Sequence, residues 1–246
     1  MALFEALRAD ENIQPSTVSF AIALKSCAQS TSLHSGRAIE GMLSAEQRRD
    51  VSILINLINL NGKCADVEKC RAIFAESEGL KLSESDRSDV WNAMIHALSR
   101  NGAMAEIDAL LLRMRENKGT DPRPNRKTFL LVISALSHSR NVKGAKALWT
   151  EIESSSEHCA LLRDEFVIAA MTDCLSRNGE VRDAHRLVTE FDARDGCAST
   201  AVMWMTLMNG CRVSREKALA QLCFEQMRQK FPRDTDYASS AAWSMR

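Results

Sequence analysis

The side chains of this 246-residue chain that could bind a metal or act as nucleophiles are its cysteines and histidines. A zinc site built from cysteines normally needs two of them separated by two residues, so that both thiolates reach one ion. No such pair occurs among Cys27, Cys64, Cys70, Cys159, Cys174, Cys197, Cys211 and Cys223. Most of them sit beside Ala, Leu and Met, where a free thiol packs as a small apolar group. We therefore predict a structural role for the cysteines, no metal site and a reducing compartment.

Other catalytic patterns are also missing from the sequence. There is no Gly-rich phosphate loop and no Gly-x-Ser-x-Gly turn that would expose a nucleophilic serine. The adjacent acids Asp164 and Glu165 are more simply charges at the start of a helix, where the positive end of the helix dipole favours them. We expect a non-catalytic protein without a cofactor.

The charge pattern does not select a partner by itself. Lysines and arginines equal aspartates and glutamates at 32 each, so the net charge gives no general electrostatic argument for nucleic acid. The stretch 113–146 is locally basic, which fits either solvated helix faces or contacts with phosphates. No apolar run approaches the roughly 18 residues that a membrane span needs, so no membrane partner is expected. The first 14 residues hold more acids than bases and do not look like a transit peptide.

The elements that position these side chains are indicated by an internal repeat. Leu-Ser-Arg-Asn-Gly occurs at 98–102 and again at 175–179, and a weaker copy lies midway at 136–141. The spacing implies a period in the high thirties of residues, about the length of stacked helical repeats or propeller blades. Each repeat has an aromatic or aliphatic residue at one register position: Phe20, Leu54, Trp91, Phe129, Ile168 and Trp204.

An apolar stretch with helical spacing follows each register position and then meets a polar breaker. The breakers are expected at Asn61-Gly62, Asn101-Gly102, 139–141, Asn178-Gly179 and Val213-Ser214. A second amphipathic helix follows each breaker. Neither helix can bury its apolar stripe alone, so the pairs must stack on one another, and the sequence predicts an all-α solenoid of helix-turn-helix repeats. The tetratricopeptide pattern fits poorly, because the position four residues after each register residue is never small.

The order of these segments resembles the pentatricopeptide repeat family, specifically its plant-type variant with alternating long and short repeats. Residues 17–27 are similar to the opening of a long repeat, 50–74 to a short repeat, and 90–95 to the opening of a standard repeat. Arg-Pro-Asn at 123–125 matches the usual end of that repeat, and 202–212 are similar to the start of the family's C-terminal extension. The resemblance implies a right-handed α-solenoid.

The same resemblance divides the chain into domains. We expect the second half of a truncated repeat at 1–16, five repeats at about 17–50, 51–87, 88–125, 126–164 and 165–200, and a partial extension at 201–246.

What the family implies is binding of single-stranded RNA, with one nucleotide per repeat contacted by the fifth residue of the first helix and the last residue of the repeat. Asn92 and Asn125 form such a pair, and amide groups can donate and accept at the edge of a pyrimidine. Asn125 could equally be a helix cap. The remaining pairs are poorer at discrimination, because their fifth residues are apolar: Ala21 with Asp50, Ile55 with about Arg87, Leu130 with Asp164, and Ala169 with about Thr200. Phosphate contacts are expected from Arg126, Lys127, Arg140 and Lys143.

Many relatives end in a zinc-dependent cytidine deaminase domain, which needs His-x-Glu and Cys-x-x-Cys. No histidine here is followed by Glu two residues later. The resemblance therefore implies non-catalytic, sequence-selective binding of single-stranded RNA in a mitochondrion or plastid, with recruitment of an RNA-editing or RNA-processing enzyme or accessory protein. Without the family, the reducing compartment would be the cytoplasm. The alternative is a protein-interaction scaffold, or a structural subunit of a ribonucleoprotein, whose RNA recognition has degenerated. Few polar fifth residues favour this alternative, and the family favours the first.

Overall fold

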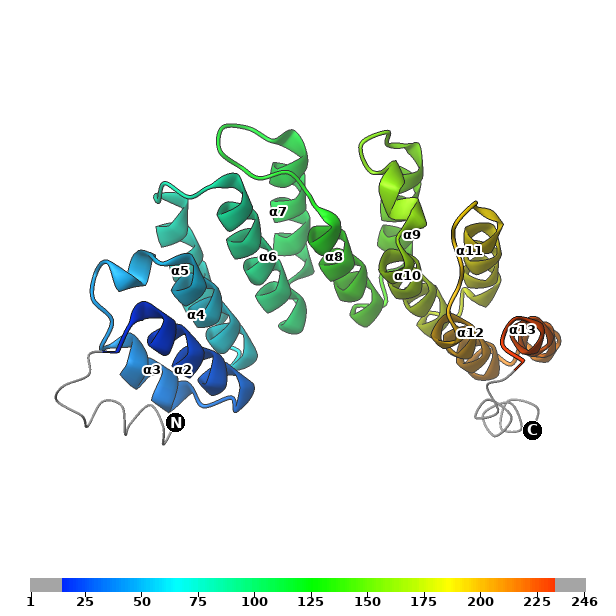
Figure 1. Ribbon diagram of the computed structural model, residues 1–246, viewed down its shortest axis with the longest axis horizontal. Helices are drawn as coiled ribbons and strands as arrows, with labels where there is room; N and C mark the ends of the chain where they lie inside the picture. The colour runs from blue at the N-terminus through cyan, green and yellow to red at the C-terminus, as the bar shows by residue number, and fades with distance from the viewer. Residues whose placement is uncertain (1–14, 233–246) are drawn as a thin grey trace. The chain divides into compact units, whose positions relative to one another are not determined.

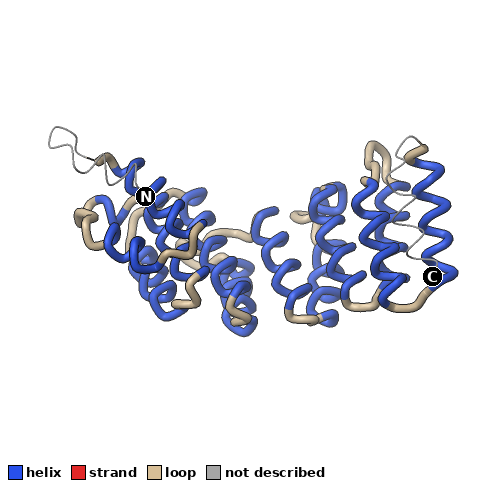
Figure 2. The backbone as a smooth tube through the Cα atoms, turned by 90° about the horizontal axis from the view of Figure 1, so that it is seen from below, coloured by secondary structure: helices blue, strands red, loops and turns tan. Residues whose placement is uncertain are grey.

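A computed structural model describes residues 15–232, and within that range the chain consists of helices joined by turns, with no strand (Figures 1 and 2). The helices alternate between two kinds, which we call first helices and second helices. The first helices are α2 (Thr17–Gln29), α4 (Val51–Lys63), α6 (Glu84–Arg100), α8 (Arg126–His138), α10 (Glu165–Arg177) and α12 (Ala201–Val213). The second helices are α3 (Leu33–Glu40), α5 (Val67–Glu78), α7 (Met104–Glu116), α9 (Val142–Ser154), α11 (Val181–Ala193) and α13 (Lys217–Lys230). Short 3-10 turns, η1 (Gln47–Arg49) and η2 (Cys159–Arg163), precede α4 and α10. The all-α expectation is confirmed.

The chain forms two compact units, which meet within α8 after Leu131. In the first unit, α2, α4 and α6 pack side by side in succession, and α3, α5 and α7 each lie against the first helix of their own pair. In the second unit, α10 packs on α12, while α11 and α13 cover these two helices. Each unit is therefore a two-layer stack of helix pairs, as an amphipathic helix-turn-helix repeat requires.

The predicted register position is the centre of the core in both units. The aromatic or aliphatic side chain at this position is at most 6% exposed in all six pairs. In the first unit Trp91 of α6 also meets the ring of Phe74 of α5 edge-on, with centroids 5.3 Å apart. Burying these large side chains supplies much of the hydrophobic stabilisation of each pair.

The turn between the two helices of a pair has the same backbone in every repeat. A residue in the left-handed region stands at six equivalent positions: Thr31 (φ 53°), Ala65 (60°), Gly102 (72°), Arg140 (55°), Gly179 (85°) and Arg215 (60°). In the two strong sequence copies, the amides after the glycines close the helix end: Ala103 N–H donates to Leu98 at 3.1 Å, and Glu180 N–H to Leu175 at 2.9 Å. The Leu-Ser-Arg-Asn-Gly repeat is thus a helix C-terminus with its glycine cap.

The breaker predicted at Asn61-Gly62 is wrong. Helix α4 continues to Lys63, both residues are buried inside it, and the left-handed turn falls at Ala65. A Cβ on Gly62 would lie 2.6 Å from the Cβ of Ala97 on α6. This glycine therefore allows close approach of two first helices, and its role is packing rather than chain reversal.

No helix within residues 15–232 is long and apolar enough to cross a membrane.

Candidate functional site

Asn92 and Asn125, the pair predicted to contact a base, lie against each other in the first unit. Asn92 is on α6 and is fully buried, whereas Asn125 is exposed just before α8. The Nδ2 of Asn92 donates to the Oδ1 of Asn125 at 3.3 Å, and the Oδ1 of Asn92 accepts from the hydroxyl of Thr128 at 2.8 Å. The fold therefore brings the two amides together and fixes them through Thr128.

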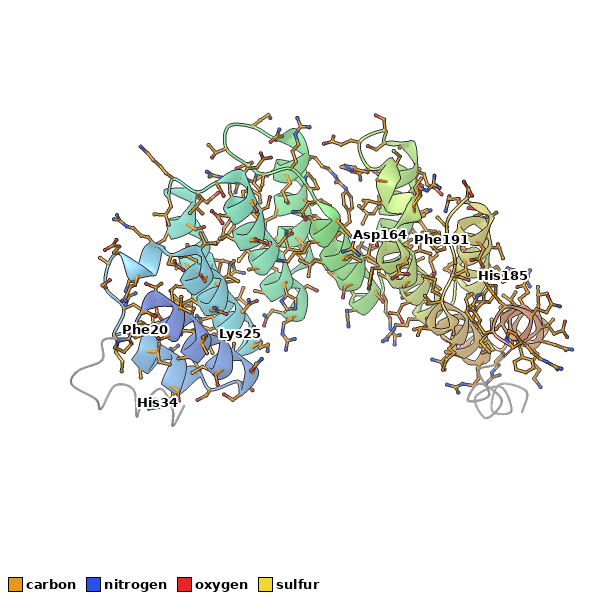
Figure 3. The ribbon with its side chains drawn as sticks, viewed as in Figure 1. Phe20, Lys25, His34, Asp164, His185 and Phe191 are labelled. Atoms are coloured by element: carbon orange, nitrogen blue, oxygen red, sulfur yellow. The ribbon has the colours of Figure 1, made fainter. Side chains whose placement is uncertain are left out.

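The last residues of three predicted repeats share a local role. The Oδ1 of Asn125 accepts from the Thr128 N–H at 3.1 Å, which caps α8. Asp50 caps α4 through the N–H groups of Ser52 and Ile53 at 2.9 and 3.2 Å. Asp164, at the start of α10 (Figure 3), accepts from Phe166 and Val167 at 3.0 and 3.1 Å. These side chains satisfy helix N–H groups, and the cap fixes where each of them stands relative to the first helix that follows.

The second repeat departs from this arrangement. Helix α6 begins at Glu84, capped by Ser83, so that Arg87 lies inside its first turn. The Arg87 guanidinium donates to the Leu82 carbonyl at 3.2 Å and to the Thr120 hydroxyl at 3.1 Å. Arg87 thus fastens two loops of the first unit.

The apolar fifth residues cannot hydrogen-bond to a base through their side chains. Ala21 of α2 is buried, at 9% exposure. Ile55 of α4, Leu130 of α8 and Ala169 of α10 are half-buried. A base next to these three would meet an apolar surface.

The four predicted phosphate contacts fall into two pairs, one in each unit. Arg126 and Lys127 are exposed in the first turn of α8, and Lys127 pairs with Asp89 of α6 at 2.9 Å. Arg140 is in the left-handed turn after α8, and Lys143 is exposed in the first turn of α9. The structure does not gather the four into one cluster within either unit.

A second set of basic residues was missed in the sequence. Four first helices end with a basic residue eight positions after the fifth residue: Lys63, Arg100, His138 and Arg177. Arg177 is partly held by Asp173 at 2.7 Å. The spacing is visible in the sequence once the fifth residues are aligned, and it marks one face of the first helices, because positions four and eight apart share a helix face.

In the first unit this face is electropositive. His96 of α6 is half-buried, and burial together with the charges of Arg100, Lys63 and Lys127 lowers its pKa below the ordinary 6.5. The three cations come from α6, α4 and α8. Basic side chains of three neighbouring first helices therefore lie near one imidazole, an arrangement that favours the approach of an anion.

The same face carries apolar side chains one turn before the fifth position. Val18 on α2 is 67% exposed, Phe166 on α10 58% and Val202 on α12 67%. Exposed apolar side chains can lie flat against the ring of a base. No group of three or more His, Cys, Asp or Glu side chains within residues 15–232 is arranged to hold a metal ion.

Stacked helix pairs with a partly basic, partly apolar face on their first helices define an α-solenoid of the repeat-protein class. The family profile described as the PPR repeat matches residues 89–118, which cover most of α6 and α7. This match and the relatives described next confirm the predicted pentatricopeptide repeat family.

Curated relatives are similar along nearly the whole chain. The mitochondrial pentatricopeptide repeat-containing protein At1g06140 of Arabidopsis thaliana is 26% identical over 96% of this chain. The Arabidopsis protein At5g65570 is 30% identical over 95% of it, and the chloroplastic At5g55740 29% over 90%. The chain spans 41%, 30% and 26% of the lengths of these relatives, respectively.

A solved structure supports the fold. The crystal structure of the pentatricopeptide repeat protein PPR10 in complex with an 18-nt psaJ RNA element matches 93% of this chain with a TM-score of 0.69, at 18% identity and over 32% of its own length. The predicted α-solenoid is thereby confirmed.

Proposed function

We propose that this chain binds single-stranded RNA along the exposed faces of its first helices, with one nucleotide contacted per repeat. The observation that carries the proposal is the Asn92–Asn125 amide pair, beside the face where Lys63, Arg100 and Lys127 act together on His96. Support also comes from PPR10, a pentatricopeptide repeat protein of similar fold that was crystallised with RNA.

Base recognition in this proposal requires a small rearrangement at Asn92. Its amide is buried and already bonded to Asn125 and Thr128 in the chain without RNA. The hydrogen bond between the two amides, at 3.3 Å, is longer than the bond from Thr128 to Asn92. The edge of a base replaces this longer bond, because it can donate and accept hydrogen bonds in one plane. Asn125 keeps its oxygen on the helix cap and offers its exposed amide nitrogen.

The other repeats contribute affinity more than sequence preference. Ala21, Ile55, Leu130 and Ala169 offer apolar contact, and Asp50 and Asp164 cap α4 and α10. Phosphate contacts come from the last-turn cations together with Arg126, Lys127, Arg140 and Lys143. We infer a pyrimidine preference at one position and weak preference elsewhere.

The wider assignments extend the family resemblance. The repeats divide at 17–50, 51–87, 88–125, 126–164 and 165–200, flanked by a partial repeat at 1–16 and a partial E-like extension at 201–246; this is the plant-type long and short subclass. Residues 1–14 and 233–246 lie outside the described part of the chain. The protein acts without catalysis in a mitochondrion or plastid, as relatives with those names suggest, and recruits an editing or processing enzyme.

The test is selection from a pool of short single-stranded RNAs at two salt concentrations. We expect enrichment of a pyrimidine at one position, lost in Asn92→Ala and in Asn125→Ala. Lys63→Ala and Arg100→Ala should instead weaken all sequences alike and lower the salt slope by about one each. Asn59→Ala, on the same face of α4 but uncharged, is the control and should retain both properties. Absence of binding at low salt would refute the proposal.

His96 gives an independent measurement by NMR. A phosphate among Lys63, Arg100 and Lys127 opposes their charges, so RNA should raise the pKa of His96. This readout stays valid if Asn92→Ala loses stability because the hydrogen bond from Thr128 to Asn92 is lost. An unchanged pKa in the presence of bound RNA would place the RNA elsewhere.

The second candidate is a protein-interaction scaffold, favoured by the burial of Asn92 and the apolar fifth residues. It predicts no RNA enrichment and an unchanged pKa of His96. The two functions are therefore separated by the same experiments.

A further inference from the structure

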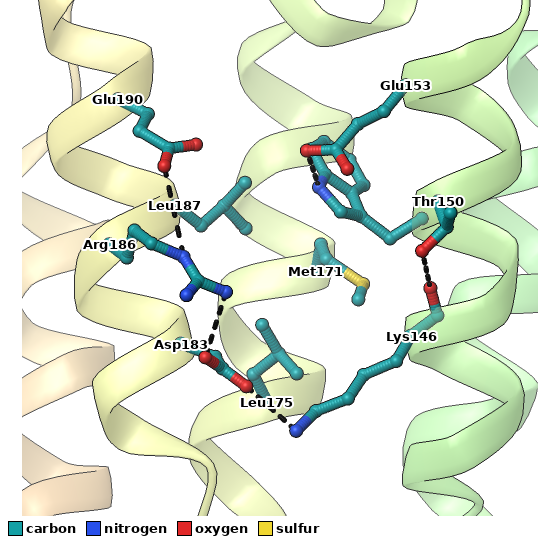
Figure 4. A pocket seen from close by; sticks show the side chains of 10 residues that line it. Lys146, Thr150, Glu153, Met171, Leu175, Asp183, Arg186, Leu187 and Glu190 are labelled. Atoms are coloured by element: carbon teal, nitrogen blue, oxygen red, sulfur yellow. Dashed lines mark hydrogen bonds and ion pairs between the residues drawn. The ribbon is translucent and has the colours of Figure 1, made fainter.

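Two hollows lie between neighbouring second helices, one in each unit. In the first unit the hollow is between α5 and α7, with Met94 and Leu98 of α6 as its floor, and has a volume of about 210 Å³. In the second unit it is between α9 and α11, with Met171 and Leu175 of α10 as its floor, and has a volume of about 480 Å³ (Figure 4).

The two hollows are repeat-equivalent and share one end. In the first, Arg71 of α5 bonds to Glu106 of α7 at 2.6 Å. In the second, Lys146 of α9 bonds to Asp183 of α11 at 2.8 Å and also to Glu180 at 2.7 Å. A basic residue early in one second helix therefore ties it to an acidic residue early in the next, in both units.

The opposite ends differ in charge. In the first unit Arg113 of α7 lines this end of the hollow. Its guanidinium bonds to Glu78 of α5 at 2.6 Å and to Asp121 at 3.0 Å, and lies 4.5 Å from the centroid of the Trp91 ring. The position equivalent to Arg113 in α11 is Glu190, and the position equivalent to Glu78 in α9 is Glu153. Two carboxylates thus occupy the walls where the first unit has a bridged acid and base.

The second hollow has a guanidinium of its own, that of Arg186, but it bonds to acids of its own helix and not to Glu153 on the α9 wall. Glu153 accepts a hydrogen bond from the indole N–H of Trp149 at 2.7 Å, which orients the ring on the α9 wall. Glu190 has only a loose contact with Arg186, 3.8 Å away, whose guanidinium bonds to Asp183 at 2.9 Å. Lys146 is held at the other end (Figure 4). The Glu153 carboxylate therefore lines the hollow beside the Trp149 ring, bonded to the indole and not to a cation.

We propose that the α9–α11 hollow receives an arginine side chain of a partner protein. The guanidinium would stand between Glu153 and Glu190, as Arg113 stands between Glu78 and Asp121, and its stem would lie on Trp149, Leu187 and Met171. A planar guanidinium can bond two carboxylates and stack on an aromatic ring at once, which an ammonium on a flexible stem does less well. The two carboxylates repel phosphate, so RNA is not the occupant.

This inference does not rest on the proposed function. The hollow faces the second helices, whereas the proposed RNA contacts are on the exposed face of the first helices. Loss of one activity should leave the other intact, and the experiment measures both.

The experiment uses the full chain and a blocked pentapeptide, acetyl-Gly-Leu-Arg-Leu-Gly-amide, followed by the NMR signal of the Trp149 indole N–H. We expect a saturable shift, with binding weaker by about tenfold or more for the same peptide carrying citrulline, the neutral isostere of arginine. Equal binding of the two peptides would show that the hollow takes an apolar segment and would overturn the proposal. Equal binding of spermidine would overturn the guanidinium assignment.

Reversing the charge of Glu190 places an arginine of the chain itself where the partner's arginine is proposed to bind. Glu190→Arg recreates the Glu78–Arg113 arrangement opposite Glu153, so it should abolish peptide binding while the chain stays folded and binds RNA pools as before. Asp108→Arg, an identical charge change on the exposed side of α7, should leave peptide binding unchanged. Wild-type peptide affinity in Glu190→Arg would place the peptide elsewhere. Sedimentation checks for a second copy as the donor: self-association lost in Glu190→Arg would replace the partner protein with the chain itself.

Discussion

The hollows between α5 and α7 and between α9 and α11 have the same floor of Met and Leu and an equivalent ion pair at one end, yet their opposite ends differ in charge. Arg113 in the first hollow is replaced by Glu190 in the second, whereas the opposing residue is a glutamate in both. In the first unit the side chain completes an ion pair and covers Trp91. In the second it leaves two carboxylates beside Trp149.

This contrast shows how a repeat protein separates structure from recognition. The residues that join one repeat to the next recur: Arg71 with Glu106, and Lys146 with Asp183. Positions outside these ion pairs can vary in charge. Each repeat contacts only its neighbours, so the loss of stability caused by a change is confined to one or two repeats. The same logic applies to the first helices, where the register residue is buried in every pair while the fifth residue changes from Ala to Asn to Leu.

The largest loss of stability is expected from giving the α5–α7 hollow the glutamate that the α9–α11 hollow has at the equivalent position. Arg113→Glu removes two ion pairs and the contact with Trp91, and places a third carboxylate beside Glu78 and Asp121. Because Arg113 is 41% exposed, solvent screens part of this, and we expect a loss of about 2 to 3 kcal/mol. Hydrogen exchange of the α5–α7 amides in mild urea measures it. Lys81→Glu, an exposed loop charge, is the control; equal effects of the two would contradict the role given to Arg113.

A smaller effect should be equal in the two units. Gly102→Val and Gly179→Val place a β-branched residue at φ 72° and 85°, which we expect to cost about 1 to 2 kcal/mol each. The reverse change, Arg140→Gly, should stabilise its turn by about 1 kcal/mol, because a side chain at φ 55° is strained. Thermal unfolding reports all three. Unchanged stability in Gly102→Val would mean that the turn does not need the left-handed residue.

The reverse exchange in the α9–α11 hollow, Glu190→Arg, should stabilise the second unit slightly. In Glu190→Arg the new guanidinium meets Glu153, and an exposed ion pair of this kind is worth roughly 0.5 kcal/mol. Hydrogen exchange of the α9 and α11 amides should slow in this variant and remain unchanged in Asp108→Arg. A destabilised Glu190→Arg would indicate that losing the contact between Glu190 and Arg186 costs more than the new contact with Glu153 gains.

The smallest effects concern the equivalent ion pairs Arg71–Glu106 and Lys146–Asp183, whose contributions to stability should depend on pH in the same way. Hydrogen bonding to Arg71 lowers the pKa of Glu106, and that to Lys146 lowers the pKa of Asp183. A lowered carboxyl pKa stabilises the fold at neutral pH, and this stabilisation is lost as the pH falls below the ordinary values of 4.5 and 3.8 and through the folded-state values. Arg71→Ala and Lys146→Ala should each slightly lower the stability of the fold at pH 7 and flatten its dependence on acid pH. A much steeper dependence in one unit would mean that the two ion pairs are not equivalent.

Much of the fold was predictable from local sequence signals. The register residues, the period and the alternation of first and second helices agree with the structure, because apolar periodicity and helix ends are encoded within a few residues. The breaker at Asn61-Gly62 was not predictable in this way. A glycine near a helix end looks the same whether it reverses the chain or admits a neighbouring helix, and only the position of Ala97 separates these roles.

The candidate site likewise has features that the sequence determines and features that only the tertiary structure decides. The types of residue at the fifth and last positions of each repeat, and the regular spacing of basic residues along the first helices, are properties of the sequence alone, and they follow from a fixed helical repeat. The tertiary structure decided that Asn92 is buried against Thr128 and that Lys63 and Lys127 lie near the imidazole of His96. It also decided that Glu78 bonds to a guanidinium while the equivalent Glu153 bonds to an indole. These outcomes depend on contacts between residues about one repeat apart in the chain, and such contacts exist only once the helix pairs have stacked.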